Sequence, residues 1–210
     1  LDPNQAGEPR GRGAILGAVG AFFAVTAVVS LLYRLHGVAL IERNLAIIAA
    51  VLFLYLPALL LWRRGRDLDQ YGLRLGSVGR GLALYGAAVV AILPLFALGY
   101  ALYVRRLCPT FFATAAQLGL PWHCPPILPK ALRLPPDLFM SALSQLLVVA
   151  LPEEFFFRGF LLGRLEESMR KRTALLLSAA LFALGHYLVT FAPGALAVFF
   201  PGLIFGLLRQ

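Results

Sequence analysis

Long apolar runs separated by short arginine-bearing segments limit the fold of this chain more than any other feature. A helix needs about 20 mainly apolar residues to cross the hydrocarbon core of a bilayer. Backbone polar groups in that core must be hydrogen-bonded internally, which a helix achieves within one segment. The candidate spans cover residues 14–33, 45–62, 81–104, 138–162, 173–191 and 195–208. The sequence therefore predicts an all-α fold, a polytopic transmembrane helical bundle of about six spans.

Composition and charge agree with a membrane protein. Hydrophobic residues make up 60% of the 210 residues and charged residues only 14%, whereas soluble domains carry about 25% charged residues. The net charge of +9 would suggest nucleic acid as the partner of a soluble protein. Here the arginines flank the apolar runs, as expected of membrane-flanking charge, and no nucleic-acid-binding motif is present. The predicted partner is the lipid bilayer, and nucleic acid is excluded.

The chain is expected to form one domain after a short tail. Residues 1–13 are polar and contain proline and glycine, so we expect a flexible amino-terminal tail, followed by a single transmembrane helical domain over 14–210. The longest connection, 105–137, is rich in proline and is predicted to be a loop. Its segment 111–120 is apolar enough to lie in the membrane interface as a short helix.

The distribution of arginine predicts the orientation. With six spans, the amino-terminal tail and the basic segments 63–80 and 163–172 fall on one side of the membrane. Short loops rich in lysine and arginine favour the cytoplasm. We therefore expect a cytoplasmic amino terminus and an extracytoplasmic 105–137 loop.

Cys108 and Cys124 are the only cysteines, and both lie in the 105–137 segment. An extracytoplasmic compartment permits a disulfide, so this pair is the favoured disulfide candidate. Two unpaired thiols are the alternative. A zinc site that includes His123 is disfavoured, because adjacent His-Cys with one distant Cys does not match the usual paired ligand spacing. We assign no metal ligand in the sequence, and metal dependence stays open.

A group of ionisable residues interrupts the apolar run 138–162. It consists of Glu153, Glu154 and Arg158. A charge at the centre of a membrane helix costs about 2.5–3.5 kcal/mol on insertion scales, and such groups are functional candidates by default. Glu154 and Arg158 are four residues apart and can pair on one helix face. Glu153 has no obvious local partner and is the leading candidate for chemistry, although the Glu154–Arg158 pair could simply tie helices together or mark the interface.

Two further residues shape this region. Pro152 lacks a backbone N–H, so it should kink the helix or start a new segment just before Glu153. His186 lies within the next span, with Phe182 one turn earlier on the same face and Gly185 beside it, where another helix can approach closely. A lone buried histidine is usually a packing residue, but beside an intramembrane Glu-Glu pair it indicates a site.

These motifs resemble the CPBP family of intramembrane proteases, which includes CaaX prenyl endopeptidases and bacterial relatives. The resemblance covers 138–210 and depends on Glu153-Glu154-x-x-x-Arg158 and on Phe182-x-x-x-His186. Segment 199–206 is similar to the glycine-bearing helix that follows in the family. Tyr71-Gly72-Leu73-Arg74 shows a weaker similarity to the family.

The resemblance implies peptide-bond hydrolysis inside a membrane-embedded cavity. Glu153 would activate water, Glu154 and Arg158 would support it, and His186 would bind water or stabilise the oxyanion. Phe157 and Phe182 are the candidates for lining the substrate cavity. The implied substrate is a membrane-associated or lipidated peptide or a C-terminal sorting tail, cleaved without a cofactor by an integral protein of a bacterial inner membrane.

One part of the family pattern is not found in the sequence. The pattern continues with a histidine, followed four residues later by Asn or Asp, on a later helix. The other histidines here, His36 and His123, lie upstream in predicted loops. We therefore expect 138–210 to be a carboxy-terminally incomplete catalytic region.

Two other functions compete with the protease hypothesis. One is a catalytically inactive membrane scaffold or interaction protein of the same fold. The other is a small transporter or proton relay, although the lack of internal repeats argues against it. Other protease types are disfavoured, because no span contains Asp and the sequence has neither His-Glu-x-x-His nor Gly-x-Ser-x-Gly.

Overall fold

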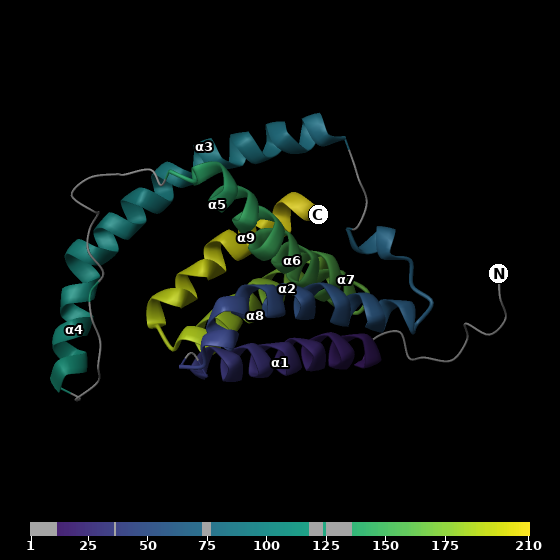
Figure 1. Cartoon of the computed structure of the whole chain (residues 1–210). Coiled ribbons are helices and arrows are strands. Elements are labelled where there is room, and N and C mark those ends of the chain that lie inside the picture. Colours follow the sequence, from purple (N-terminus) through teal and green to yellow (C-terminus); the bar gives the residue numbers. More distant parts are fainter. Residues whose placement is uncertain (1–11, 36, 73–76, 118–123, 125–135) are drawn as a thin grey trace. The chain divides into compact units, whose positions relative to one another are not determined.

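The computed structural model describes residues 12–35, 37–72, 77–117, 124 and 136–210 (Figure 1). Within those residues every regular element is helical and none is a strand, which confirms the all-α prediction. His36, His123, the 73–74 part of the Tyr71 motif and nearly all of the predicted tail lie outside the described residues. The chain, expected to be one domain, is divided into two compact units. Residues 1–74 with 139–210 form the first and 75–138 the second, and each is described by itself.

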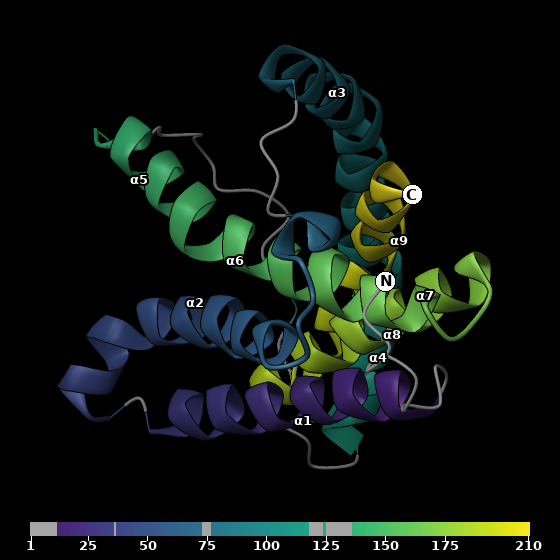
Figure 2. The same ribbon diagram turned by 90° about the vertical axis from the view of Figure 1, so that its right-hand side faces the viewer.

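The first unit begins with two neighbouring helices, α1 (Arg12–Arg34) and α2 (Ala39–Trp62). They lie side by side and are joined by a short link (Figures 1 and 2). Each starts a few residues before the predicted span. α1 also packs against α8 (Lys171–Thr190), where the Ser30 hydroxyl donates to the Leu188 carbonyl at 2.8 Å.

The acidic motif lies in one continuous helical run made of five segments. They are α5 (Leu138–Ser144), the π segment η4 (Gln145–Ala150), α6 (Leu151–Glu154), the π segment η5 (Phe155–Leu162) and α7 (Gly163–Glu166). No residue of α5 or η4 is buried, whereas all eight residues of η5 are buried. The run therefore passes from an exposed half into the centre of the unit.

Pro152 explains one of the two π segments. Its ring nitrogen cannot donate to the carbonyl four residues earlier. The preceding turns are wide, and α6 begins at Leu151 with Pro152 in its first turn. The backbone at Ala150 keeps helical angles of φ −64° and ψ −47°, so the run continues without a break. A new segment at Pro152 is one of the two outcomes that the sequence predicts.

The carboxy-terminal elements pack along α8. That helix ends at Phe191, whose φ of 51° lies in the left-handed region that non-glycine residues rarely adopt. The Arg34 guanidinium lies 4.4 Å from the centre of the Phe191 ring. A 3-10 segment η6 (Pro193–Val198) then leads into α9 (Phe199–Arg209), so only the second part of the predicted sixth span is α-helical.

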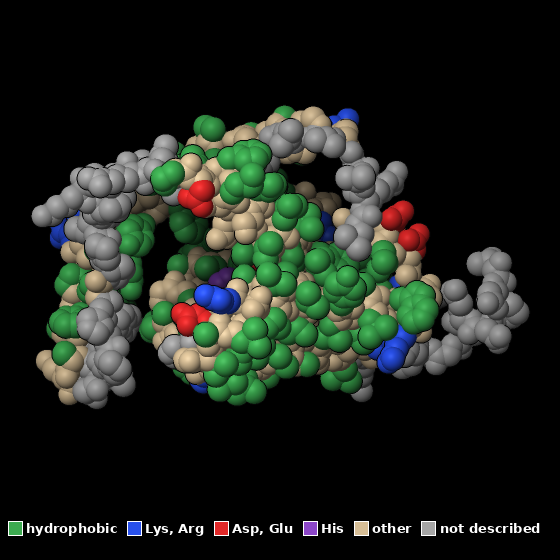
Figure 3. All heavy atoms as spheres, in the orientation of Figure 1, with side chains coloured by type: hydrophobic (Ala, Val, Ile, Leu, Met, Phe, Trp, Pro, Cys, Tyr) green, Lys and Arg blue, Asp and Glu red, His purple; other side chains and the backbone are tan. Residues whose placement is uncertain are grey.

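Four helices are long and apolar enough to cross a membrane, among the residues that the structure describes. They cover Gly13–Arg34, Ala39–Trp62, Gly79–Thr114 and Lys171–Thr190. Pro193–Arg209 is a shorter apolar helix, and the motif run is divided into short segments. Apolar side chains cover much of the face drawn in Figure 3, and its charged side chains form small separate groups. Four of the six predicted spans thus meet the length and composition expected of a membrane helix.

The second unit contains α3 (Val78–Leu102), a π segment η3 (Tyr103–Leu107) and α4 (Cys108–Gln117). The loop predicted to begin at residue 105 is therefore helical as far as Gln117. Pro109 would normally interrupt such a helix, because it lacks a donor and its ring crowds the preceding turn. The wide η3 turn directly before α4 accommodates it.

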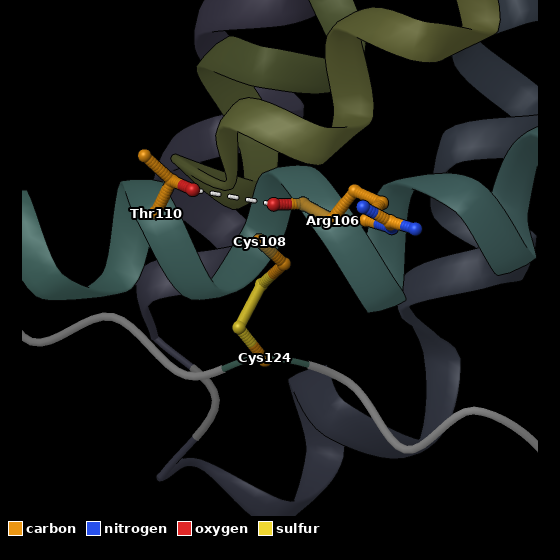
Figure 4. The surroundings of a disulfide bond; sticks show 4 residues. All are labelled: Arg106, Cys108, Thr110 and Cys124. Carbon is orange, nitrogen blue, oxygen red and sulfur yellow. Dashed lines mark hydrogen bonds between the residues drawn. A yellow bond between two sulfur atoms is a disulfide. The ribbon is translucent and has the colours of Figure 1, made fainter.

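Cys108 and Cys124 form a disulfide in the second unit (Figure 4). Their Cα atoms are 5.7 Å apart, and Cys108 is fully buried at the start of α4. The described residues contain no group of three or more His, Cys, Asp or Glu side chains that could hold a metal ion.

We predict that Phe22 is a main packing anchor of the first unit. It is 0% exposed, and a Cβ added at Gly185 of α8 would lie 3.1 Å from its ring. Phe-to-Ala changes in protein cores cost about 3–5 kcal/mol. We expect Phe22→Ala to fall near the lower end, because lipid provides no hydrophobic drive for helix association. Unfolding in mixed detergent micelles would measure this, with Phe23→Ala as the control because Phe23 is 48% exposed. Equal losses would contradict the prediction.

We also predict that the native protein contains no reactive thiol. Because the two cysteines are paired, a maleimide reagent should add nothing to the denatured, unreduced protein and two labels after reduction. Mass spectrometry reads the result directly. Labelling without reductant would support the free-thiol alternative.

Candidate active site

Glu153 and Glu154 occupy the last two positions of α6, between two π segments. Arg158 follows one turn later in η5. π segments inside α-helices occur frequently at functional sites. The π segments thus indicate the same candidate residues as the sequence does.

Glu154 and Arg158 form the predicted i,i+4 ion pair, with 3.3 Å between a guanidinium nitrogen and a carboxylate oxygen. Arg158 is only 4% exposed, whereas the Glu154 side chain is 45% exposed. Neither terminal nitrogen of Arg158 has a hydrogen-bond partner among the described residues. The contact is therefore mainly electrostatic, and it joins a buried cation to a carboxylate at the rim of the site.

Two aromatic rings stabilise the same cation. The central guanidinium carbon of Arg158 lies 4.2 Å from the centre of the Phe182 ring and 5.7 Å from that of Phe205. A desolvated cation–π contact contributes about 2 kcal/mol. Phe182 comes from α8 and Phe205 from α9, so this one side chain is contacted by three elements of the unit.

Glu153 is close enough to His186 and Arg158 to interact electrostatically with both. Both Glu153 and His186 are half-buried. The Phe182 ring contacts both Arg158 and His186, with its centre 4.5 Å from that of the His186 ring. Packing of η5 on α8 therefore brings an acid, a guanidinium and an imidazole into one cluster.

The hydrogen bond of His186 fixes its tautomer. Its Nδ1 lies 3.0 Å from the carbonyl oxygen of Phe182, one turn earlier in α8. A carbonyl only accepts, so Nδ1 carries the hydrogen and donates it. Nε2 is then the nitrogen that can contact water or a substrate.

Phe157 and Phe182 are both buried in the aromatic core. The Phe157 ring contacts that of Phe182 edge to face, at a centroid distance of 4.8 Å, and also meets Phe22 and Phe53. The Ser178 hydroxyl donates to the Phe157 carbonyl at 3.2 Å. These positions make both rings supports of the site, and a direct contact with substrate stays a prediction.

The disulfide candidates of the sequence are described apart from this cluster. Cys108 and Cys124 belong to the second unit. Conversely, sequence reasoning did not identify Phe205, although it singled out the 199–206 segment that contains it. Aromatic residues are common in all the spans, so only the tertiary packing distinguishes this ring.

The fold and the cluster together define the class of protein. Membrane-length helices and an acid, arginine and histidine cluster on adjacent helices indicate an integral membrane protein with a polar site among its helices.

The comparison with protein families is more specific. Residues 135–210 match the family model of the type II CAAX prenyl endopeptidase Rce1-like proteins. This confirms the resemblance to the CPBP family over that range, which contains all four polar residues of the site, and it supports a peptidase at the level of the family. No curated protein and no solved structure matches the chain.

We predict energetic coupling between Phe182 and Arg158. If the ring stabilises the buried cation, a double-mutant cycle of Phe182→Leu with Arg158→Gln should give a coupling of about 1–2 kcal/mol in unfolding free energy. Phe200→Leu is the matched control, because Phe200 is 62% exposed. Its cycle with Arg158→Gln should give a coupling near zero. Equal coupling in the two cycles would show that the ring does not stabilise the cation.

Proposed function

We propose that this chain is an intramembrane endopeptidase in which Glu153 activates a water molecule for attack on a peptide bond. The observation that carries the proposal is that Glu153 lies within electrostatic range of His186 and Arg158, in a helical run that packs on α8. The family match of 135–210 supports the reaction class.

In the first step, water adds to the carbonyl carbon of the scissile bond. The carboxylate of Glu153 accepts the proton that the water loses. A general base is effective when it is positioned against the reacting water and only partly solvated. Glu153 meets the second condition because it is half-buried. The product of this step is a tetrahedral intermediate with a negative oxygen.

His186 can take one of two roles in this step. The uncharged ring accepts a hydrogen bond from the water at Nε2, because Nδ1 is already bonded to Phe182. In the alternative role, a ring that took up a proton from solvent before the reaction donates from Nε2 to the oxyanion, and Glu153 remains the group that accepts the proton of the water. Collapse of the intermediate breaks the C–N bond, and the proton held by Glu153 passes to the leaving amine. The products are a carboxylic acid and an amine.

Glu154 and Arg158 act on the position and charge of the site. The Arg158 cation lies near both carboxylates, so it reduces the repulsion between the two adjacent acids. The Phe182 and Phe205 rings and the ion pair with Glu154 hold the Arg158 side chain in place from three elements. The charge balance of the site therefore depends on a group that solvent hardly reaches.

We propose a substrate whose scissile bond lies close to a membrane anchor, such as a lipidated peptide or a C-terminal sorting tail. The apolar surroundings of the site favour a segment that already partitions into lipid. We propose that the protein lies in a bacterial inner membrane with its amino terminus on the cytoplasmic side. The short loops richer in arginine and lysine lie on that side.

The test uses the purified chain in liposomes with a fluorogenic farnesylated CaaX peptide and the same peptide without its lipid. The wild type should cleave the lipidated peptide. Glu153→Gln should lose about 10²–10⁴-fold in kcat, the usual contribution of a general base. His186→Ala should lose about 10²–10³-fold if it stabilises the oxyanion.

Glu42→Gln is the matched control, because Glu42 is an exposed carboxylate on α2. It should leave cleavage unchanged. A folded wild type that cleaves neither peptide, or full activity in Glu153→Gln, would contradict the proposal and favour the scaffold function.

A further inference from the structure

A short turn between α2 and α3 packs directly on the helix that carries the acids. This turn, η2 (Leu68–Tyr71), places Tyr71 against η5, and Tyr71 is only 4% exposed. A Cβ added at Gly159 would overlap the Tyr71 carbonyl oxygen. One added at Gly163 would lie 3.1 Å from the Tyr71 ring. Gly159-x-x-x-Gly163 therefore forms a notch that the Tyr71 backbone and ring fill, as small residues do where helices approach closely.

Polar contacts hold Tyr71 in this notch. Its hydroxyl donates to Glu167, whose other carboxylate oxygen accepts from Arg164 at 2.7 Å and from Arg66 at 3.4 Å. Burial raises the pKa of the Tyr71 phenol above its ordinary value, and the bond to Glu167 raises it further. The hydroxyl therefore stays protonated and keeps donating near neutral pH.

The turn itself is locally fixed. The Asp67 carboxylate accepts from the Asp69 backbone N–H at 3.1 Å, and Gly72 ends the turn with φ of 95°. A side chain at that φ would be strained. The segment that presents Tyr71 is thus held at both ends by its own sequence.

The acid-bearing helix has a particular need for such a contact. Gly159 directly follows Arg158, and the π segments on both sides of α6 leave the run without a regular α-helical register. A wider turn changes the direction in which the side chains before it point relative to those after it. A fixed external contact at Gly159 and Gly163 determines the rotation of the helix at this place.

We propose that Tyr71 is a positioning residue that sets the rotation of η5, and through it the placement of Glu153 against His186. This inference rests on the proposed function for its kinetic consequence, but its structural part is independent. Tyr71 contacts the helix backbone and Glu167 and none of the four polar residues of the site in the contacts described above.

The kinetic test compares Tyr71→Ala and Gly159→Ala with the wild type on the farnesylated peptide. Because a displacement of about 1 Å can cost 10²-fold, we expect kcat to fall at least about tenfold in both variants. KM should stay within about twofold, because substrate binding is not the interaction removed. A merely destabilised enzyme would instead lose active molecules in proportion to its unfolded fraction, which unfolding curves measure separately.

Matched controls exist for both variants. Tyr55 is 70% exposed, and a Cβ at Gly20 would meet nothing within 4 Å, so Tyr55→Ala and Gly20→Ala should both retain wild-type kcat. Tyr71→Phe keeps the ring in the notch and loses only the bond to Glu167. It should recover most of the activity that Tyr71→Ala loses. Wild-type kcat in both Tyr71→Ala and Gly159→Ala would overturn the proposal.

A second measurement needs no activity. Hydrogen–deuterium exchange in nanodiscs should show amides of 155–166 exchanging at least about tenfold faster in Tyr71→Ala, because the docked turn no longer protects them. Amides of α1 should be unchanged. Unaltered exchange in 155–166 overturns the proposal even if Glu153→Gln is inactive. Faster exchange supports it even if the peptide is never cleaved. If Tyr71→Ala does not fold, Gly159→Ala gives the same comparison, because its Cβ would overlap the Tyr71 carbonyl oxygen.

Discussion

The buried guanidinium of Arg158 is the constraint on which the site depends. An ion in an apolar interior is tolerated only when partners replace its lost hydration, and removing one partner of a buried pair is costly. Here the replacement comes from Glu154 in the same run, from Phe182 in α8 and from Phe205 in α9. The helical run, α8 and α9 must therefore pack together around the Arg158 cation. The same Phe182 ring also contacts His186, so the arrangement of the candidate site follows from the solvation of one charge.

The support of this cluster extends beyond the region that carries the family match. Phe22 of α1 packs against Gly185, the neighbour of His186, and its ring contacts Phe157. The Ser30 hydroxyl bonds the Leu188 carbonyl in the same helix as His186. Residues 135–210 thus contain the candidate site, while α1 helps to hold the histidine helix in place. The match to the family model covers 135–210 and does not include these amino-terminal helices.

The parts that the sequence predicted are those fixed by local physics. Apolar length predicted the helices, the four-residue spacing predicted the Glu154–Arg158 pair, and Pro152 predicted a new segment. The loop expected from residue 105 was wrong over 105–110, because a wide turn before Pro109 lets the helix continue, whereas the short helix expected from residue 111 is present as far as Gln117. Phe205 and the Tyr71 notch were not predicted. Each depends on segments far apart in the chain, and a phenylalanine or a glycine in a span carries no signal of what packs against it.

The π segment before the acids has a consequence for how related chains compare. A π turn holds one residue more than an α turn. This π segment, η4, and the preceding α5 have no buried residue, whereas every residue of η5 is buried. Loss of one residue within 145–150 would turn this wide stretch into a regular one, and the buried half would keep its packing. Alignments of homologues should therefore tolerate a single-residue gap at this point, upstream of the two glutamates, more readily than anywhere else in the run.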